Sequence, residues 1–142
     1  IRIKVMELLY REITNIILKV YYYVYNELGY GFLEKVYHNA MLYELQQNGL
    51  KVESQKPIKV YYKEKQVGEY FADLVVNDSI IVELKASELL VYENEVQLIN
   101  YLRATNIEVG LLLNFGKKAE YKRKIFTNDL KNHWFNKISN ES

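Results

Sequence analysis

The amino-acid sequence predicts one α/β domain with two helices, a β-meander, a third helix and a returning strand. Three observations predict this class. Two segments with apolar residues at helical spacing come first, several short strand-like runs follow, and a third helical segment then separates two apolar strands. A connection through that helix is long enough to make the two strands parallel, whereas the turns before it indicate an antiparallel meander.

The first two predicted helices open the chain. Apolar residues recur at helical spacing from about Arg2 to Leu28, and Gly29-Tyr30-Gly31 supplies the permissive backbone that a helix end requires. A second helix is expected from Phe32 to about Gln47, where Asn48-Gly49 ends it. Two further helices are expected over Tyr92–Ala104 and Asp129–Ile138.

The strand signals lie between the second and third helices and after the third. Pro57 is expected at the start of a strand, where its missing N–H does little harm. The expected strands are Lys51–Ser54, Ile58–Lys63, Val67–Val76, Ile80–Ala86 and, after the third helix, Glu108–Asn114. The predicted order is therefore α-α-β-β-β-β-α-β, with Tyr121–Phe126 as a candidate for one more strand.

Composition limits the class of protein. A chain of 142 residues predicts a single domain, residues 1–142, that buries roughly two-thirds of its unfolded surface. The absence of cysteine excludes disulfides and thiolate–zinc sites. No apolar run approaches the length that a bilayer requires and no secretory signal is evident, so we expect a cytoplasmic protein without a membrane partner.

Charge and tyrosine content bear on binding partners. The formal net charge of +1 gives no global attraction to nucleic acid, so any such binding must come from a local patch. The chain has 14 tyrosines, and those at positions 21, 22, 23 and 25 must point in several directions around one helix. This tyrosine-rich helix is a candidate surface for homo-oligomer formation.

The stretch from Glu69 to Ala86 holds the most informative polar residues. Asp73, Glu83 and Lys85 lie in strands that are otherwise apolar, where a charge is costly unless it is paired or bound to a metal. Asp73, Glu83 and the Leu84 backbone carbonyl could ligate Mg²⁺ or Mn²⁺, with Lys85 holding or deprotonating the attacking water. The alternative is a salt bridge on an exposed face of the sheet.

The length of the turn decides whether the two carboxylates meet. A two-residue turn at Asn77-Asp78 would pair Asp73 with Val82 and send Glu83 to the opposite face. A three-residue loop, 77–79, would pair Asp73 with Glu83, roughly 4.5–5.5 Å apart between Cβ atoms. Both loop lengths are common. We predict the three-residue loop because the chemistry requires that register.

Three further groups are candidates for the site. Glu34 and Tyr37 lie on one helix face, and Glu34 either adds an acidic ligand or complements the helix dipole. Gln97 and Tyr101 form a polar stripe that either contacts a phosphate or is a polar edge of helix packing. Basic residues later in the chain could follow a phosphate backbone or be a solvated surface. The candidate nucleic-acid contacts are Tyr37, Tyr101, Arg103, Lys117, Lys118 and Arg123.

These constellations, taken together, resemble the GxxExxY protein family, a branch of the PD-(D/E)XK nuclease superfamily. The resemblance covers roughly residues 10–126, and the matching segments are 24–42, 55–62, 67–76, 80–86, 97–105 and 109–116. It implies a restriction-endonuclease-like core, which is a central mixed β-sheet flanked by helices, with the metal site where the sheet splays. It also implies that Glu34, Asp73 and Glu83 are the acidic residues, Lys85 the catalytic lysine and Gln97 the accessory polar residue. The tyrosines at 21–25 are bulkier than the small residues that the family pattern has there.

The sequence therefore predicts a metal-dependent nuclease (a hydrolase) that cleaves phosphodiester bonds in nucleic acid, DNA rather than RNA. The predicted catalytic residues are Lys85, Glu34 and Gln97, with Mg²⁺ or Mn²⁺ as cofactor. The alternative is a catalytically silent module that keeps the nuclease fold to bind nucleic acid or a protein partner. A third reading is an oligomerising accessory protein that associates through the tyrosine-rich helix.

Overall fold

A computed structural model describes residues 2–131. Three helices and five strands follow one another in it as α-α-β-β-β-α-β-β. The elements are α1 (Arg2–Leu28), α2 (Glu34–Gln47), β1 (Val52–Tyr62), β2 (Lys65–Val76), β3 (Ile80–Lys85), α3 (Tyr92–Arg103), β4 (Val109–Phe115) and β5 (Ala119–Ile125). Residues 128–131 form a further helical turn, and the rest of the helix expected to Ile138 lies outside the described residues.

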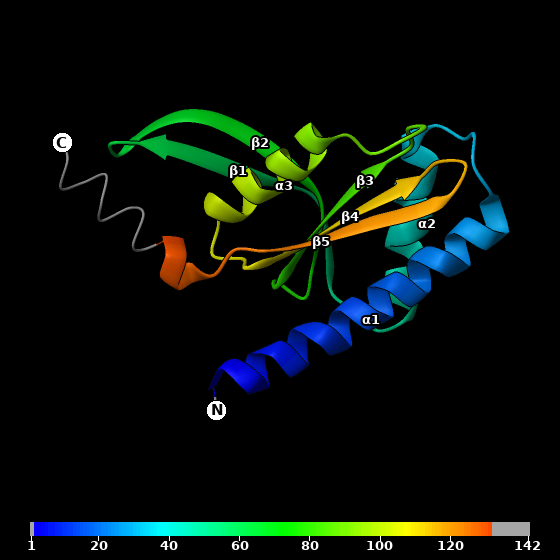
Figure 1. The fold of residues 1–142 in the computed structure, drawn as a ribbon, viewed down its shortest axis with the longest axis horizontal. Coiled ribbons are helices and arrows are strands. Elements are labelled where there is room, and N and C mark those ends of the chain that lie inside the picture. Colours follow the sequence, from blue (N-terminus) through cyan, green and yellow to red (C-terminus); the bar gives the residue numbers. More distant parts are fainter. Residues whose placement is uncertain (1, 132–142) are drawn as a thin grey trace.

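The five strands form one mixed sheet in the order β1-β2-β3-β4-β5 (Figure 1). Strand β3 runs parallel to β4, and the other neighbouring pairs are antiparallel. The parallel pair is the one joined by α3, as the length of the connection predicts. The predicted fold class, a mixed sheet flanked by helices, is confirmed.

The two long N-terminal helices cover one face of the sheet. Their buried residues recur at three- and four-residue spacing, which places one apolar stripe of each helix against the strands. The stripe on α1 comprises Ile17, Val20, Tyr21 and Val24, and that on α2 comprises Tyr37, Met41 and Leu45. The strands contribute Leu74, Val76, Ile80, Val82, Leu84, Val109, Leu111, Leu113 and Phe115 to the same cluster.

Helix α3 packs on the opposite face. Its residues Leu98 and Leu102 are fully buried in a second apolar cluster with Ile81 of β3 and Leu112 of β4. A Cβ at Gly110 would lie 2.6 Å from the Leu98 side chain, so a glycine is what lets the helix approach β4 so closely. Because β3 is covered on both faces, its residues Ile80 to Leu84 are all buried.

Strands β1 and β2 extend beyond the sheet as a two-stranded arm, which we define as residues 55–73 (Figure 1). Strand β2 pairs with β3 only from Leu74 to Val76, whereas its pairing with β1 continues to Lys65. The pairing skips Gln55, which has a φ of 53°, and shifts again between Val60 and Tyr61. Such irregularities bend a β-ribbon, and the first lies level with Asp73.

The structure corrects two strand predictions. The strands expected at 51–54 and 58–63 are one strand, β1, and Pro57 lies within it, opposite Phe71. Because β1 is an edge strand, the missing N–H of Pro57 interrupts no second ladder. The candidate last strand is present as β5. Three strands therefore precede the third helix, one fewer than predicted, and two follow it, one more than predicted.

The predicted three-residue turn between β2 and β3 is confirmed. Val76 pairs with Ile80 and Leu74 with Val82, which leaves residues 77–79 as the loop. Asn77 and Asp78 both have positive φ, the left-handed conformation that these residue types tolerate. In the described part of the chain, no helix has both the length and the apolar character that crossing a membrane demands.

Candidate active site

The carboxylates of Asp73 and Glu83 meet where β2 and β3 diverge. The ladder between these strands ends at Leu74 and Val82, one residue before the two acids. The Asp73 backbone N–H donates to Glu83 Oε1 at 3.0 Å, and the Leu84 backbone N–H donates to Asp73 Oδ2 at 2.8 Å. Each carboxylate thus accepts from the backbone of the neighbouring strand, and this crossed pair fixes both side chains.

Burial makes the negative charge of Glu83 costly. The side chain is 5% exposed, and desolvation raises its pKa to about 9, with the charge of Asp73 acting in the same direction. The hydrogen bond from the Asp73 backbone and the nearby Lys85 ammonium oppose the rise. Two carboxylates pressed together in a poorly solvated place are a common arrangement at functional sites.

Lys85 and Glu34 approach this pair from two other elements. Lys85 follows Glu83 by two residues on β3, so both side chains share the face toward α3. Glu34 begins α2, where desolvation raises its pKa, Lys85 and His38 lower it, and Asp73 raises it. Helix α2 contacts β3, and the charges of Asp73 and Lys85 act on the pKa of Glu34, so the first turn of α2 lies near the open end of the β2–β3 hairpin.

The loop before α2 explains the residues around Glu34. Gly31 has a φ of 107°, which favours glycine. The Tyr37 hydroxyl donates to the Gly29 carbonyl at 2.7 Å and accepts from the Phe32 N–H at 3.2 Å, so Tyr37 closes the loop that presents Glu34.

The structure therefore corrects the nucleic-acid contact predicted for Tyr37. Its side chain is fully buried, and its ring stacks on Phe115 with 4.2 Å between centroids. A residue without exposed surface has nothing to offer a bound strand. Spacing on a helix could not reveal this, because it does not say which of several aromatic residues folds back on the preceding loop.

Gln97 and Tyr101 of α3 form a second polar pair near the carboxylates. Gln97 Nε2 donates to the Tyr101 hydroxyl at 2.9 Å. Burial raises the pKa of Tyr101 to about 12, and the negative charges of Glu83 and Asp73 contribute to the rise. Tyr101 packs in the cluster that contains Ile81, so the predicted stripe on α3 lies on the Glu83 face of the sheet. The Tyr101 ring is packed against Tyr70 of β2 with 5.7 Å between centroids.

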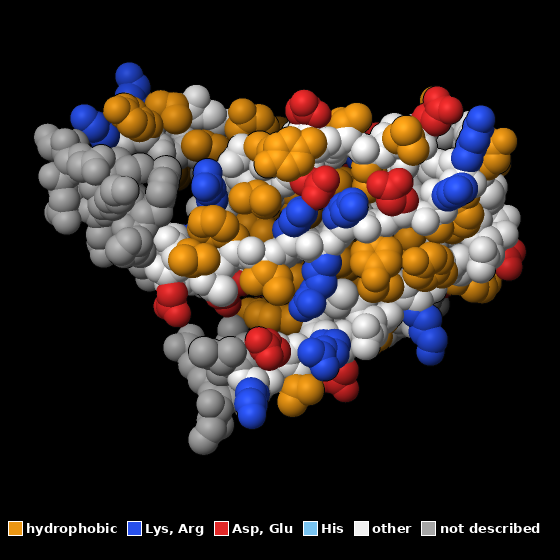
Figure 2. Space-filling model, in the orientation of Figure 1, with side chains coloured by type: hydrophobic (Ala, Val, Ile, Leu, Met, Phe, Trp, Pro, Cys, Tyr) orange, Lys and Arg blue, Asp and Glu red, His pale blue; other side chains and the backbone are white. Residues whose placement is uncertain are grey.

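The predicted basic residues divide into two groups. Lys117 and Lys118 are exposed in the β4–β5 loop, at the end of β4 where β3 presents Lys85. Arg103, at the end of α3, is exposed and lies over the Phe126 ring at 5.2 Å. Lys and Arg residues are interspersed with apolar and acidic ones on the face of the molecule that Figure 2 shows.

Arg123 lies on the other face of the sheet. It pairs with Leu111, which belongs to the cluster under α1 and α2, whereas Lys122 pairs with Leu112 on the Glu83 face. The Lys124 ammonium confirms this assignment, because it lies 2.6 Å from Glu95 of α3. Lys122 and Lys124 therefore share the face of the acids, whereas the nucleic-acid contact predicted for Arg123 lies on the opposite face.

Sequence reasoning missed Asn114 as a residue of this region. Asn114 pairs with Lys85 in register and is 1% exposed. Its side-chain amide accepts from the Ser87 N–H at 3.0 Å and donates to the Ser87 carbonyl at 2.9 Å. These bonds hold the chain that leaves β3 directly after Lys85. The signal was a polar side chain at the carboxyl end of an otherwise apolar buried strand.

The tyrosine-rich part of α1 is only partly available as a surface. The Tyr21 hydroxyl shares its one proton between the carbonyls of Asn114 and Glu120, and the Tyr25 hydroxyl shares its proton between those of Gly116 and Lys117. These two side chains fasten the β4–β5 loop to α1. Tyr22 and Tyr23 are 41% and 54% exposed. Any self-association through this helix would therefore use Tyr22 and Tyr23.

The donor set at the open end of the hairpin fits one hard divalent cation. Within residues 2–131 no group of three or more His, Cys, Asp or Glu side chains is placed to hold a metal. Mg²⁺ in proteins, however, is usually bound through one or two carboxylates with water and substrate oxygens completing the shell. The Leu84 carbonyl points to the same side of β3 as its N–H, toward Asp73. A cation there would relieve the repulsion that raises the pKa of Glu83.

Comparisons with known proteins bear on the family and the fold of the chain. The family model of the PD-(D/E)XK nuclease superfamily matches residues 11–124. No curated protein matches the chain. The fold is similar to a solved protein described as the crystal structure of SSO0001, with a TM-score of 0.56 and 16% sequence identity. The similarity covers 77% of this chain and 59% of that one, and at this identity it shows the fold alone.

Proposed function

The chain belongs to the PD-(D/E)XK nuclease superfamily, and we propose that it is a metal-dependent nuclease that hydrolyses phosphodiester bonds in nucleic acid, with DNA as the expected substrate. One observation carries the proposal. Two carboxylates from adjacent strands, Asp73 and Glu83, are locked together by crossed backbone hydrogen bonds, with Lys85 on the same face.

Asp73, Glu83 and the Leu84 carbonyl are the proposed ligands of Mg²⁺ or Mn²⁺. A divalent cation at such a site polarises a phosphoryl oxygen and offsets the charge that develops on the phosphorus centre. The backbone donors fix one oxygen of each carboxylate, so the side chains are already oriented and lose little freedom on binding. Within the superfamily, we propose that the chain belongs to the GxxExxY family.

Lys85 is the proposed group that acts on water. Its ammonium would donate a hydrogen bond to the attacking water and oppose negative charge in the transition state. The water oxygen would then bond to phosphorus and release one proton to solvent while the opposite P–O ester bond breaks, and the leaving oxygen would take up a proton from solvent. Glu34 and Gln97 are proposed to assist: Glu34 from the start of α2, and Gln97 by fixing the Tyr101 hydroxyl toward the carboxylates.

The test is cleavage of plasmid and single-stranded DNA with Mg²⁺ or Mn²⁺. The wild type is expected to cleave, and Lys85→Ala and Asp73→Ala are expected to lose at least about 100-fold in rate, the scale for removing one transition-state donor. Lys65→Ala is the matched control, because Lys65 is an exposed lysine of the two-stranded arm that does not line the neighbouring cavity. Equal cleavage by the wild type and both site variants would indicate contamination and end the proposal.

Calorimetric titration with Mn²⁺ separates an enzyme from a silent binding module. Carboxylate-dependent Mn²⁺ binding that Asp73→Ala abolishes supports a working metal site. Nucleic-acid binding without Mn²⁺ binding or cleavage would support the module instead.

We also propose a cytoplasmic location and self-association through Tyr22 and Tyr23. Sedimentation at several concentrations tests the association, since Tyr23→Ala should shift the protein toward the monomer.

A further inference from the structure

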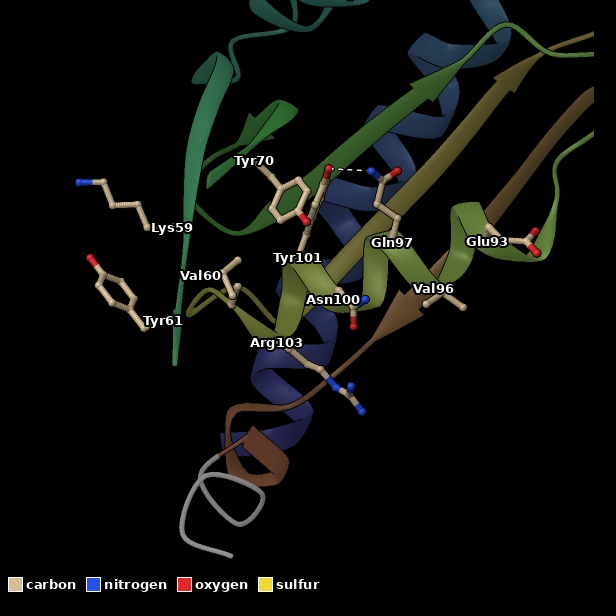
Figure 3. Close-up of a pocket in the computed structure, with 11 residues that line it drawn as sticks. Lys59, Val60, Tyr61, Tyr70, Glu93, Val96, Gln97, Asn100, Tyr101 and Arg103 are labelled. Carbon is tan, nitrogen blue, oxygen red and sulfur yellow. Dashed lines mark hydrogen bonds between the residues drawn. The ribbon is translucent and has the colours of Figure 1, made fainter. Parts of the chain in front are cut away.

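A cavity lies between α3 and the two-stranded arm, beside the proposed active site (Figure 3). Its volume is about 680 Å³, within the range of pockets that hold small molecules or cofactors. The arm contributes Val60 and Tyr70, which turn toward α3, whereas Lys59 and Tyr61 turn to the outer side of β1. The cavity exists because the arm bends beyond Asp73 and curves over α3.

The lining combines one open aromatic ring with amide groups. Tyr70 is 50% exposed although its ring is packed against Tyr101, so part of the ring is open to a ligand. Gln97 and Asn100 lie on α3 opposite the arm, and each carries donors and an acceptor in one plane. A flat aromatic ligand with a hydrogen-bonding edge matches this lining, which describes a nucleobase.

The cavity and the acidic site share residues of α3. Gln97 and Tyr101 line the cavity and are hydrogen-bonded to each other at 2.9 Å. The charges of Glu83 and Asp73 add to the rise that burial causes in the pKa of Tyr101. The helix rises about 9 Å from Gln97 to Arg103, and both residues line the cavity. The cavity therefore extends only a short distance along α3 from the part of the helix near the acids. A nucleotide bound there would lie next to the phosphate held at the site.

We propose that this cavity receives one unpaired nucleobase of a single-stranded segment, which stacks on Tyr70 while the adjoining phosphate lies at Asp73 and Glu83. The inference rests on the proposed function and narrows its substrate to single-stranded nucleic acid. A base within a duplex is stacked on both sides and paired along its edge, so it could enter only after leaving the helix. Aromatic platforms beside a basic margin are the usual means of binding single strands.

The charges at the margins suit a phosphate backbone. Arg103 lines the cavity at one end of α3, and Lys59 lies on the outer side of the arm. Lys124 Nζ lies 2.6 Å from Glu95 Oε1 of α3, and this ion pair offsets a negative charge that would otherwise repel the bound nucleic acid. Glu93 remains at the rim nearest the start of α3. The strand is therefore expected to leave the cavity on the Arg103 side.

The test measures binding without cleavage. Fluorescence anisotropy with a labelled oligothymidylate and with a duplex of equal length, both in EDTA, compares the wild type with Tyr70→Ala, Tyr70→Phe and Tyr62→Ala. We expect the wild type to prefer the single strand. Tyr70→Ala should weaken that binding on the order of 5- to 100-fold, the range for loss of one stacked base. Tyr70→Phe keeps the ring and should stay near the wild type.

Tyr62 is the matched control, because it lies on the same arm, is 60% exposed and does not line the cavity. Asn100→Ala, on the exposed side of α3, should weaken binding by a smaller factor and guards against a folding defect in Tyr70→Ala. Equal affinities of the Tyr70→Ala and Tyr62→Ala proteins, or equal affinity of the wild type for duplex, would overturn the inference. Tyr70-dependent binding without cation-dependent cleavage would uphold the pocket and reject the hydrolysis.

Discussion

The two ends of the β2–β3 hairpin use the same backbone in different ways. At the closed end, the strands bond to each other over residues 74–76 and 80–82, and the side chains of these six residues are buried. At the open end, the backbone N–H groups of Asp73 and Leu84 donate to the carboxylates of Glu83 and Asp73. The carboxylate oxygens accept the hydrogen bonds that backbone carbonyls accept in the ladder next to them.

This difference shows how the fold can hold two acids in its interior. A buried N–H must find an acceptor, and a carboxylate meets that requirement while bringing a charge into a poorly solvated place. The closed end therefore contributes stability, whereas the open end costs stability in the absence of a cation. We expect substitutions at the two ends to separate folding from activity.

Leu74→Ala is expected to have the largest effect on folding. Leu74 is fully buried under α1 and α2, and its truncation should lower the free energy of unfolding by about 2–5 kcal/mol. Urea denaturation measures the change, and activity per folded molecule should persist. Asp73→Asn, one residue away, should abolish cleavage without a comparable loss. A stability loss of the same size at Asp73 would remove the distinction between the two ends.

The second prediction concerns pH, since burial raises the pKa of Glu83 to about 9 from an ordinary 4.5. Between these values the folded protein keeps a proton that the unfolded chain has released. The stability due to this proton is therefore complete below about pH 4.5 and is lost as the pH rises through 9. In metal-free buffer the free energy of unfolding should fall by up to about 1.4 kcal/mol per pH unit.

Glu83→Gln is the matched variant for this measurement, because it keeps the shape of the side chain and removes the titration. Its stability should depend less on pH between about 5 and 7.5. Above that window Lys131 acts in the opposite direction, since burial lowers its pKa to about 8 and the folded state releases its proton early. Identical pH profiles for Glu83→Gln and the wild type would contradict the raised pKa.

Much of the fold was readable because its signals are local. Helix spacing, the Asn77-Asp78 turn residues and the length of the α3 connection gave the elements and the parallel pair. The sequence did not predict that β1 is one strand, because Pro57 is a local signal for the start of a strand. Only the sheet shows that β1 lies at an edge, where proline is tolerated within a strand. Edge position is a tertiary property.

The placement of the candidate site residues was predictable where a strand register decides it, and less so where packing decides it. Asp73, Glu83 and Lys85 follow from the loop length and strand alternation alone. Tyr37 and Arg123 depend on which face of an element is covered, and a run of basic or aromatic residues does not contain that information. Asn114 was missed because its partners are backbone atoms of Ser87, 27 residues away in sequence.

Gln97→Ala is expected to reduce cleavage modestly, roughly three- to tenfold, which corresponds to one lost hydrogen bond. The substitution removes the donor that fixes the Tyr101 hydroxyl beside the carboxylates. Single-turnover kinetics should show the loss in the chemical step. Gln66→Ala, at an exposed position of the two-stranded arm, is the control and should match the wild type. Equal rates for both variants would assign Gln97 to helix packing.

The smallest effect is expected from the basic residues, and it tests which face of the sheet meets the strand. Lys117 and Lys118 lie at the end of β4 beside the site, whereas Arg123 lies on the face covered by α1 and α2. Replacing both lysines by alanine should weaken single-strand binding and lower the slope of log K against log salt by about 1.4. Arg123→Ala should leave that slope unchanged. A lower slope for Arg123→Ala instead would place the bound strand on the opposite face from Glu83, away from the carboxylates.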